Sequence, residues 1–154
     1  MRKAIWAVTL VGVLAGGAMV AGTTIALAQA DIIKQRQENR KATGPLMREI
    51  KETIESKGDA KKIVAAAAKL TELENAFDKM FPAGSDQGAE TAALPTVWSD
   101  SAGFAAASKN ADALFDKLAV AAGSGDFAAM ATAFGTLGKE GCGGCHTKFR
   151  AKKS

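Results

Sequence analysis

The stretch that decides the fold is Asp126 to Phe149, DFAAMATAFGTLGKEGCGGCHTKF, close to the carboxyl end of the chain. Its inward side chains recur every three or four residues, which is the spacing of one face of an α-helix. Aspartate is favoured just before a helix, so we expect Asp126 to cap this one. The predicted inward face consists of Phe127, Met130, Phe134, Leu137, Gly141, Cys145 and Phe149.

The end of this helix contains both cysteines and the single histidine of the 154-residue chain, in the run Cys142-Gly143-Gly144-Cys145-His146. Two thiols three positions apart can each add to one vinyl group of a haem, and the adjacent imidazole can ligate the iron. Residues spaced by three and four positions also share one helical face. The run therefore predicts one covalently bound haem c, held by Cys142 and Cys145, with His146 as the axial iron ligand.

A Cys-x-x-Cys pair has other uses, and these stay open at this point. A structural zinc site takes four Cys or His ligands, whereas this chain offers three, so carboxylates or a second chain would have to complete it. A disulfide, structural or redox-active, is the other alternative. A reactive dithiol normally lies at the start of a helix, and this pair lies near the end of one. The dithiol interpretation makes the chain an oxidoreductase, whereas the haem interpretation predicts no enzyme activity.

The amino end has the pattern of a secretory signal peptide. Met1-Arg2-Lys3 precede an uncharged stretch over residues 4–30, which ends in the small-residue pattern Ala28-Gln29-Ala30. We expect cleavage after Ala30 and a periplasmic protein, with residues 31–154 forming one domain. Export also agrees with thioether attachment of haem, which belongs in a compartment where free cysteine pairs oxidise. An uncleaved membrane anchor is the alternative, because a membrane span needs roughly 20 residues.

The charge balance points to neither nucleic acid nor a membrane surface as a partner. Lysine and arginine together number 20 against 16 acidic residues, and signal removal takes away Arg2 and Lys3. We expect the basic tail to be a solvated helix end that complements the helix dipole, or a docking patch for an acidic redox partner. This tail consists of Lys148, Arg150, Lys152 and Lys153. The expected partners are periplasmic redox donor and acceptor proteins.

Two amphipathic stretches form the first half of the domain. In the first stretch, the inward positions recur at helical spacing and place Arg36 and Arg40 on the apolar stripe. These positions are 33, 36, 40, 43, 47, 50 and 54. The second follows Asp59 as a helix cap, carries inward residues from Ile63 to Met80, and ends at Phe81-Pro82.

A third stretch and a crossover complete the fold prediction. Residues 83–96 are polar and contain glycine, and the third helix runs from near Val97 through Leu118 until Gly123-Ser124-Gly125 interrupts it. Strand patterns are lacking throughout the sequence. The predicted fold class is all-α, an antiparallel up-and-down four-helix bundle with haem bound to the carboxyl-terminal helix.

The two arginines and three methionines define the other side of the predicted haem site. A guanidinium cannot coordinate iron, and burying one unpaired costs several kcal/mol. Arg36 and Arg40 therefore either bind haem propionates or reach solvent at the bundle edge. Met130 shares the haem-bearing helix and Met80 lies at the end of the second helix, so Met47 is the candidate sixth ligand.

Glycine and proline inside the helices carry two further predictions. Gly44-Pro45 removes one helical hydrogen bond and predicts a kink near Met47. Each interior glycine of the last helix costs about 1 kcal/mol relative to alanine. These glycines either let a flat macrocycle approach the backbone or allow close packing between helices. They are Gly135, Gly138, Gly141, Gly143 and Gly144.

The chain is similar to the class II c-type cytochromes, of which cytochrome c' is the best-known member. Besides the attachment motif, the resemblance rests on three runs in the family's order: Ile33-Lys34-Gln35-Arg36-Gln37, Leu94-Pro95-Thr96-Val97-Trp98 followed by Phe104, and Cys145-His146-Thr147-Lys148-Phe149-Arg150. It covers residues 31–154 and implies periplasmic electron transfer. In cytochrome c' it also implies a five-coordinate iron that binds NO or CO, and often a homodimer.

By position, the resemblance assigns roles to individual residues. It implies that His146 is the proximal ligand, that Arg36 lies near a propionate and that Arg150 lies beside the proximal imidazole. Position 40 is where the distal residue falls, which is methionine in six-coordinate members and bulky apolar or aromatic in cytochrome c'. Arg40 fits neither pattern. We therefore expect an open or water-occupied sixth site, with Met47 ligation as the alternative.

Overall fold

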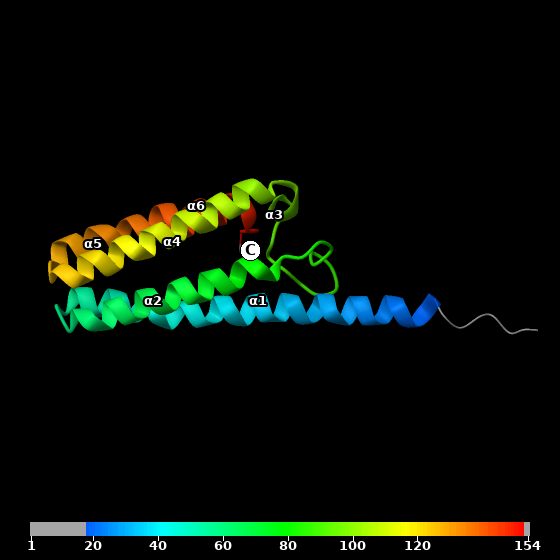
Figure 1. Cartoon of the computed structure of the whole chain (residues 1–154), viewed down its shortest axis with the longest axis horizontal. Helices are drawn as coiled ribbons and strands as arrows, with labels where there is room; N and C mark the ends of the chain where they lie inside the picture. Colours follow the sequence, from blue (N-terminus) through cyan, green and yellow to red (C-terminus); the bar gives the residue numbers. More distant parts are fainter. Residues whose placement is uncertain (1–17, 153–154) are drawn as a thin grey trace, which may run out of the picture.

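Runs of good helix formers, separated by a few glycine, proline and aspartate residues, produce long helices in two layers (Figure 1). The computed structural model describes residues 18–152. Within this range the chain contains no strand, as predicted. One layer consists of α1 (Ala18–Glu55) and α2 (Ala60–Phe77), and the other of α4 (Ser101–Ser124), α5 (Phe127–Thr136) and α6 (Gly143–Phe149).

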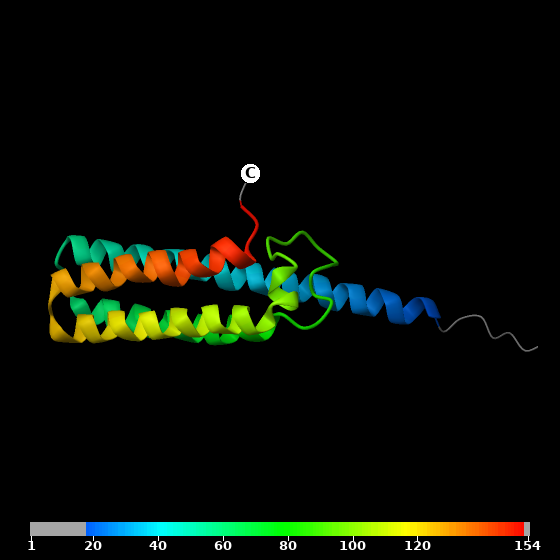
Figure 2. The same cartoon turned by 90° about the horizontal axis from the view of Figure 1, so that it is seen from above.

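The helices form four antiparallel rods (Figure 2). The fourth rod comprises α5, a π-helical segment (Leu137–Cys142) and α6, which continue one another. Short loops join the first rod to the second and the third to the fourth, whereas residues 81–95, here called the crossover segment, join the second rod to the third. The predicted all-α four-helix bundle is confirmed.

Aspartate caps begin the second and fourth rods, as predicted. The Asp59 carboxylate accepts a hydrogen bond from the backbone N–H of Lys61 at 3.0 Å. The Asp126 carboxylate accepts from Ala128 and Ala129 at 2.9 and 3.2 Å. Just before it, Gly125 ends α4 with φ of 76°, a left-handed conformation that favours glycine.

The first rod is longer and more continuous than its apolar stripe indicated. It begins at Ala18, well before Ile33, because the intervening residues include strong helix formers and no proline. It also continues as one α-helix through Gly44-Pro45, and the kink expected there stays a prediction. Residues 1–17 of the predicted signal peptide lie outside the described range. No helix among residues 18–152 combines the length and hydropathy that membrane crossing requires.

The third predicted helix is divided in two. A short α3 (Thr96–Ser99) precedes Asp100, whose φ of −121° and ψ of 54° interrupt the helix before α4. The Asp100 carboxylate accepts from Gly103 N at 3.0 Å. Because aspartate satisfies helix-start donors well, this residue begins a new helix instead of continuing the old one.

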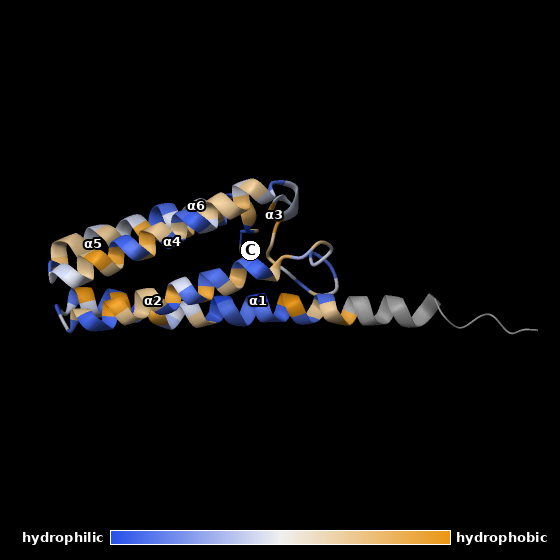
Figure 3. Ribbon diagram, viewed as in Figure 1, coloured by the Kyte–Doolittle hydropathy of each residue, from blue (hydrophilic) through white to orange (hydrophobic). Residues whose placement is uncertain are grey.

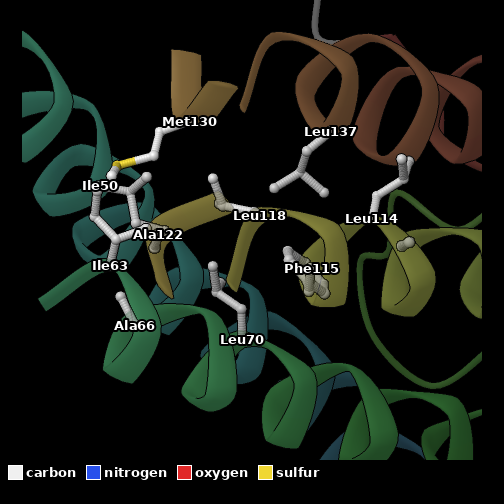
Figure 4. Packing of buried hydrophobic residues seen from close by; sticks show 11 residues of the cluster. Ile50, Ile63, Ala66, Leu70, Leu114, Phe115, Leu118, Ala122, Met130 and Leu137 are labelled. Carbon is white, nitrogen blue, oxygen red and sulfur yellow. The ribbon is translucent and has the colours of Figure 1, made fainter. Parts of the chain in front are cut away.

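The main apolar core contains side chains from every rod (Figure 4). Ile50, Ile63, Leu118, Met130 and Leu137 are fully buried there. Hydrophilic residues dominate the described part of α1, whereas α4 and α5 are more apolar (Figure 3), which agrees with a single inward stripe on α1. A second, aromatic cluster around Phe104 and Phe149 packs nearer the crossover segment.

Candidate functional site: a cavity beside the Cys-x-x-Cys-His motif

The rod that carries the Cys-x-x-Cys-His motif changes its hydrogen bonding at the start of the motif, where Leu137–Cys142 are π-helical. Such segments occur frequently at functional sites, and the sequence pattern did not predict this one. A Cβ added to Gly141 would lie 3.1 Å from Leu137 Cδ1 and 3.3 Å from Leu114 Cδ1. Close packing therefore explains Gly141. It does not explain Gly135, Gly138 or Gly144, where an added Cβ meets nothing within 4 Å.

A cavity of about 560 Å³ lies between the two layers beside the motif. Cys142, Cys145 and His146 all line it from the α6 layer, and residues of α1 and α2 line it from the other layer. Its volume falls within the range of roughly 300–1,000 Å³ that is usual for cofactor and ligand sites. The fold thus places the three predicted attachment residues on the wall of one cavity.

Aromatic rings form the end of the cavity that faces the crossover segment. Phe81 packs edge-on against Phe77 and Phe104, each with ring centroids 4.8 Å apart, and Phe104 packs against Phe149 at 5.3 Å. Trp98 completes the cluster and donates its indole N–H to the Pro82 carbonyl at 3.1 Å. This surface suits a large planar apolar group.

Arg36 is buried at this end, with 4% of its surface exposed. Its Nη2 donates to the Ser85 carbonyl, and its guanidinium lies 4.6 Å from the centroid of the Phe81 ring. Burial lowers the pKa of Arg36, but a guanidinium remains protonated in proteins. Its Nε and Nη1 have no partner among the described residues. Two buried charged donors at the cavity wall fit a cofactor carboxylate.

Arg40 also lines the cavity, and it is paired with a carboxylate of the protein. Its Nη1 donates to Glu74 Oε2 at 2.7 Å, and its Nε and Nη2 donate to Asn39 Oδ1 at 2.9 and 2.8 Å. Glu74 is 8% exposed and was missed by the sequence analysis. Its position four residues after Leu70 and three before Phe77, on the inward stripe of α2, was the available signal.

The pKa values of the motif residues argue against dithiol chemistry and agree with metal ligation by His146. Burial, reinforced by the charge of Glu74, raises the pKa of Cys145 to about 11, and the same causes raise the pKa of Cys142. A reactive dithiol needs a lowered thiol pKa. Burial, with smaller effects of Arg150 and Arg40, lowers the pKa of His146. The imidazole is then neutral near pH 7, which is the form that ligates metals.

The remaining candidates occupy different places. Met47 lines the cavity from α1 and packs partly against the main core. Met130 is fully buried within that core and does not line the cavity. Arg150 lines the cavity edge but is exposed and has extended backbone, paired with Ala93 in an isolated bridge. The helix therefore ends at Phe149: Lys148 is exposed in its last turn, as expected of a basic helix end, whereas Arg150 and Lys152 lie beyond it.

The crossover segment forms another wall of the cavity, through Thr91–Ala93. Backbone hydrogen bonds join it to the end of the chain: Leu94 N donates to Phe149 O at 3.0 Å and Ala151 N to Ala92 O at 2.8 Å. Gln37 Nε2 adds a bond to the Glu90 carbonyl at 3.0 Å. A segment far from the motif in sequence is thus held against it.

Known proteins share this arrangement. The family model described as Cytochrome C' matches residues 31–150. Cytochrome c' from Rhodopseudomonas palustris is 37% identical over 146 residues, covering 90% of this chain and 94% of that protein. The structure of cytochrome c' from Rubrivivax gelatinosus aligns with a TM-score of 0.70 at 35% identity, covering 79% and 96% of the two chains. The structure of a nitric oxide complex of a variant of cytochrome c prime from Alcaligenes xylosoxidans aligns with a TM-score of 0.71 at 28% identity. The alignment covers 81% of this chain and 97% of that chain.

Fold and similarity together define a helical haem-binding protein, and its Cys-x-x-Cys-His motif lies on the last helix. The chain belongs to the cytochrome c' family, whose members bind haem c and are a standard example of the up-and-down bundle. The residues present fit that cofactor, because they offer two thiols, a neutral imidazole, an aromatic surface and two buried guanidinium donors around one cavity.

Proposed function

We propose that the protein is a periplasmic monohaem c-type cytochrome that transfers electrons and catalyses no reaction of its own. Cys142 and Cys145 hold haem c covalently, and His146 is the axial ligand of its iron. The observation that supports this most strongly is that all three side chains line one cavity. When bound, the haem supplies a one-electron ferric–ferrous couple.

The chain's own residues position the cofactor and keep water away from it. Arg36 holds one propionate through Nε and Nη1, since these donors are buried and have no partner among the described residues. The aromatic cluster around Phe104 packs against the ring. Arg150 lies at the cavity edge and, as the family resemblance implies, beside the proximal imidazole.

Acid–acetone extraction and intact mass of the exported protein test covalent attachment. We expect the pigment to stay with the protein and the mass to exceed that of the polypeptide by one haem. Extraction of all colour into acetone would contradict the proposal. A protein with no added haem mass, and with a redox-active Cys142–Cys145 pair, would favour the dithiol alternative.

The iron is five-coordinate or binds water in this proposal. Arg40 faces the cavity from the layer opposite His146 but cannot ligate iron. Met47 lines the same side and is the alternative sixth ligand. A near-red methionine-to-iron charge-transfer band in the ferric spectrum, lost in Met47→Leu, would establish methionine ligation and overturn the open site.

A second function, binding of NO or CO at the open position, is supported by the relative that forms a nitric oxide complex. Mixing the reduced protein with CO tests it. A shift of the haem absorption bands at equilibrium is the expected result, and an unchanged spectrum would count against an open site.

Export and assembly complete the proposal. The signal peptide is cleaved after Ala30, so residues 31–154 form the mature domain, which meets its redox donor and acceptor in the periplasm and forms a homodimer. Cell fractionation and the amino-terminal sequence of the mature protein test the first part, since retention of residues 1–30 would indicate an anchor. Light scattering after size-exclusion chromatography tests the second.

A further inference from the structure

The α1–α2 layer presents an ion pair to the cavity. Arg40 Nη1 lies 2.7 Å from Glu74 Oε2, and the Arg40 guanidinium carbon lies 3.6 Å from the centroid of the Phe77 ring. Ser108 Oγ of α4 lies 3.2 Å from Glu74 Oε1, but its single proton is donated to the nearer Asp78 Oδ1 at 2.6 Å. Arg40 is therefore the charged partner of Glu74, and the guanidinium is fixed by stacking as well as by charge.

One N–H group of the Arg40 guanidinium is not used in hydrogen bonds to the described residues. A guanidinium has five N–H groups. Nε donates one hydrogen bond to Asn39 Oδ1. Nη2 donates one to Asn39 Oδ1 and one to Leu73 O, the latter at 3.3 Å, and Nη1 donates one to Glu74. The second Nη1 hydrogen has no acceptor among the described residues. Because the side chain is 33% exposed and lines the cavity, this donor is available to a small ligand.

The charges around the cavity favour a negative ligand. Its lining includes one carboxylate, Glu74, and the cations Arg36, Arg40 and Arg150. Lys41 also lines it, but its ammonium is exposed and pairs with Glu38 at 2.8 Å. Arg36 is already suited to a cofactor carboxylate through its two buried donors. Arg40 has its own protein carboxylate and does not need one from the cofactor.

The ion pair lies opposite the attachment motif. Arg40 and Glu74 belong to one layer and His146 to the other, and all three line the same cavity. With His146 as axial ligand from one layer, the opposite coordination position would face the layer that carries Arg40.

We propose that the face of the cavity opposite His146 is a binding site for small inorganic anions, in which Arg40, oriented by Glu74 and Asn39, donates a hydrogen bond to the bound anion. This inference rests on the proposed haem attachment and open sixth position. It makes Arg40 a specificity-determining residue that favours charged ligands over neutral CO, because CO gains little from a charged donor.

The test uses the haem-loaded protein, with azide titrated into the ferric form and CO into the reduced form at constant ionic strength. In Arg40→Leu we expect azide affinity to fall about tenfold to a hundredfold, which is the contribution of a hydrogen bond to a charged group. CO affinity should change by much less. Arg40→Lys should retain part of the azide affinity, since it keeps the charge without the planar donor set.

The matched control is Arg48→Leu, which removes an exposed arginine on the same helix away from the cavity and should leave both affinities unchanged. Glu74→Gln removes the competing negative charge and should strengthen azide binding. If Arg40→Leu does not fold, Arg40→Lys and Glu74→Gln still test the anion site, because the first should weaken azide binding and the second should strengthen it.

Three outcomes would overturn the inference: no azide binding by the open ferric protein, equal azide affinity with and without the guanidinium, or parallel changes for azide and CO. Parallel changes would mean that the arginine acts by its bulk. Failure of the proposed function looks different, because a protein without covalent haem, or one with a methionine-to-iron band, is recognised before azide is added.

Discussion

Arg36 and Arg40 lie one turn apart on α1, yet their surroundings differ. Arg40 has a carboxylate partner within the protein, whereas Arg36 stacks on aromatic rings and uses one nitrogen on a carbonyl. Since an unpaired buried cation is costly, Arg36 is the residue whose stability contribution should depend most on the cofactor.

Arg36→Met should therefore act differently with and without haem. In the haem-loaded protein we expect the free energy of unfolding to fall by about 1.5–3 kcal/mol, the value of a hydrogen bond to a charged group. In a haem-free chain with both cysteines changed to alanine, the loss should be smaller or reversed, because an unpaired buried charge disappears. Urea unfolding measures both, with Arg48→Met as the control. Equal losses in the two forms would refute the propionate role.

Asp112 should destabilise the fold at neutral pH. Burial, and the negative charges of Glu74, Asp78 and Asp116, raise the pKa of Asp112 above its ordinary 3.8. A carboxyl whose folded pKa is raised binds more protons in the folded state, so stability falls as pH rises from 3.8 upward through the folded value. Asp112→Asn should raise Tm by a few degrees near pH 7 and should change little at the acid end. A Tm gain that does not vary with pH would contradict the electrostatic cause.

At the scale of elements, the fourth rod combines two hydrogen-bonding patterns that one periodic stripe could not reveal. Its inward residues recur every three or four positions throughout, so the sequence predicted a single helix from Asp126 to Phe149. The π-helical segment depends on hydrogen-bond register, which side-chain periodicity does not encode. Of the glycines in this rod, Gly141 is explained by its contact with α4, whereas nothing within 4 Å requires a glycine at Gly138.

A comparison of Gly138→Ala with Gly141→Ala should show whether packing against α4 requires the glycine at position 141. An added methyl at Gly138 meets nothing within 4 Å, so the helix-propensity gain of up to about 1 kcal/mol should appear as increased stability. At Gly141 the methyl crowds Leu137 and Leu114, so the gain should be cancelled or reversed. Thermal unfolding of the two haem-loaded variants provides the comparison. Equal stabilisation of both would show that Gly141 is not a packing requirement.

At the scale of the whole molecule, the sequence predicted the four rods, the Asp59 and Asp126 caps and the inward stripe of α1. Local periodicity and capping chemistry determine these features. It did not predict the Glu74–Ser108 contact or the bonds between Ala92 and Ala151, because these join residues 34 and more positions apart through tertiary packing. The Cys-x-x-Cys-His site was predictable because its reactive residues are contiguous in the sequence. The residues that line the cavity opposite the motif belong to three separate segments, namely α1, α2 and the crossover segment.

The long-range bonds at the chain end lead to the last prediction, that the final residues hold the crossover segment closed over the cavity. Truncation after Phe149 removes the Ala151 N donor to Ala92 O and the Arg150 pairing with Ala93. Losing one or two such backbone hydrogen bonds should cost about 1–2 kcal/mol. The segment should then open more often and admit proteases, since local opening limits their access.

Limited proteolysis of the haem-loaded protein, followed by mass spectrometry, measures this opening. We expect cuts within residues 82–93 to appear faster after truncation at Phe149. Truncation after Ala151 is the matched control, because it removes three residues of the tail but keeps the bond to Ala92. Identical cleavage rates in the two truncated proteins would mean that Gln37 and Arg36, through their bonds to Glu90 and Ser85, hold the segment without help from the tail.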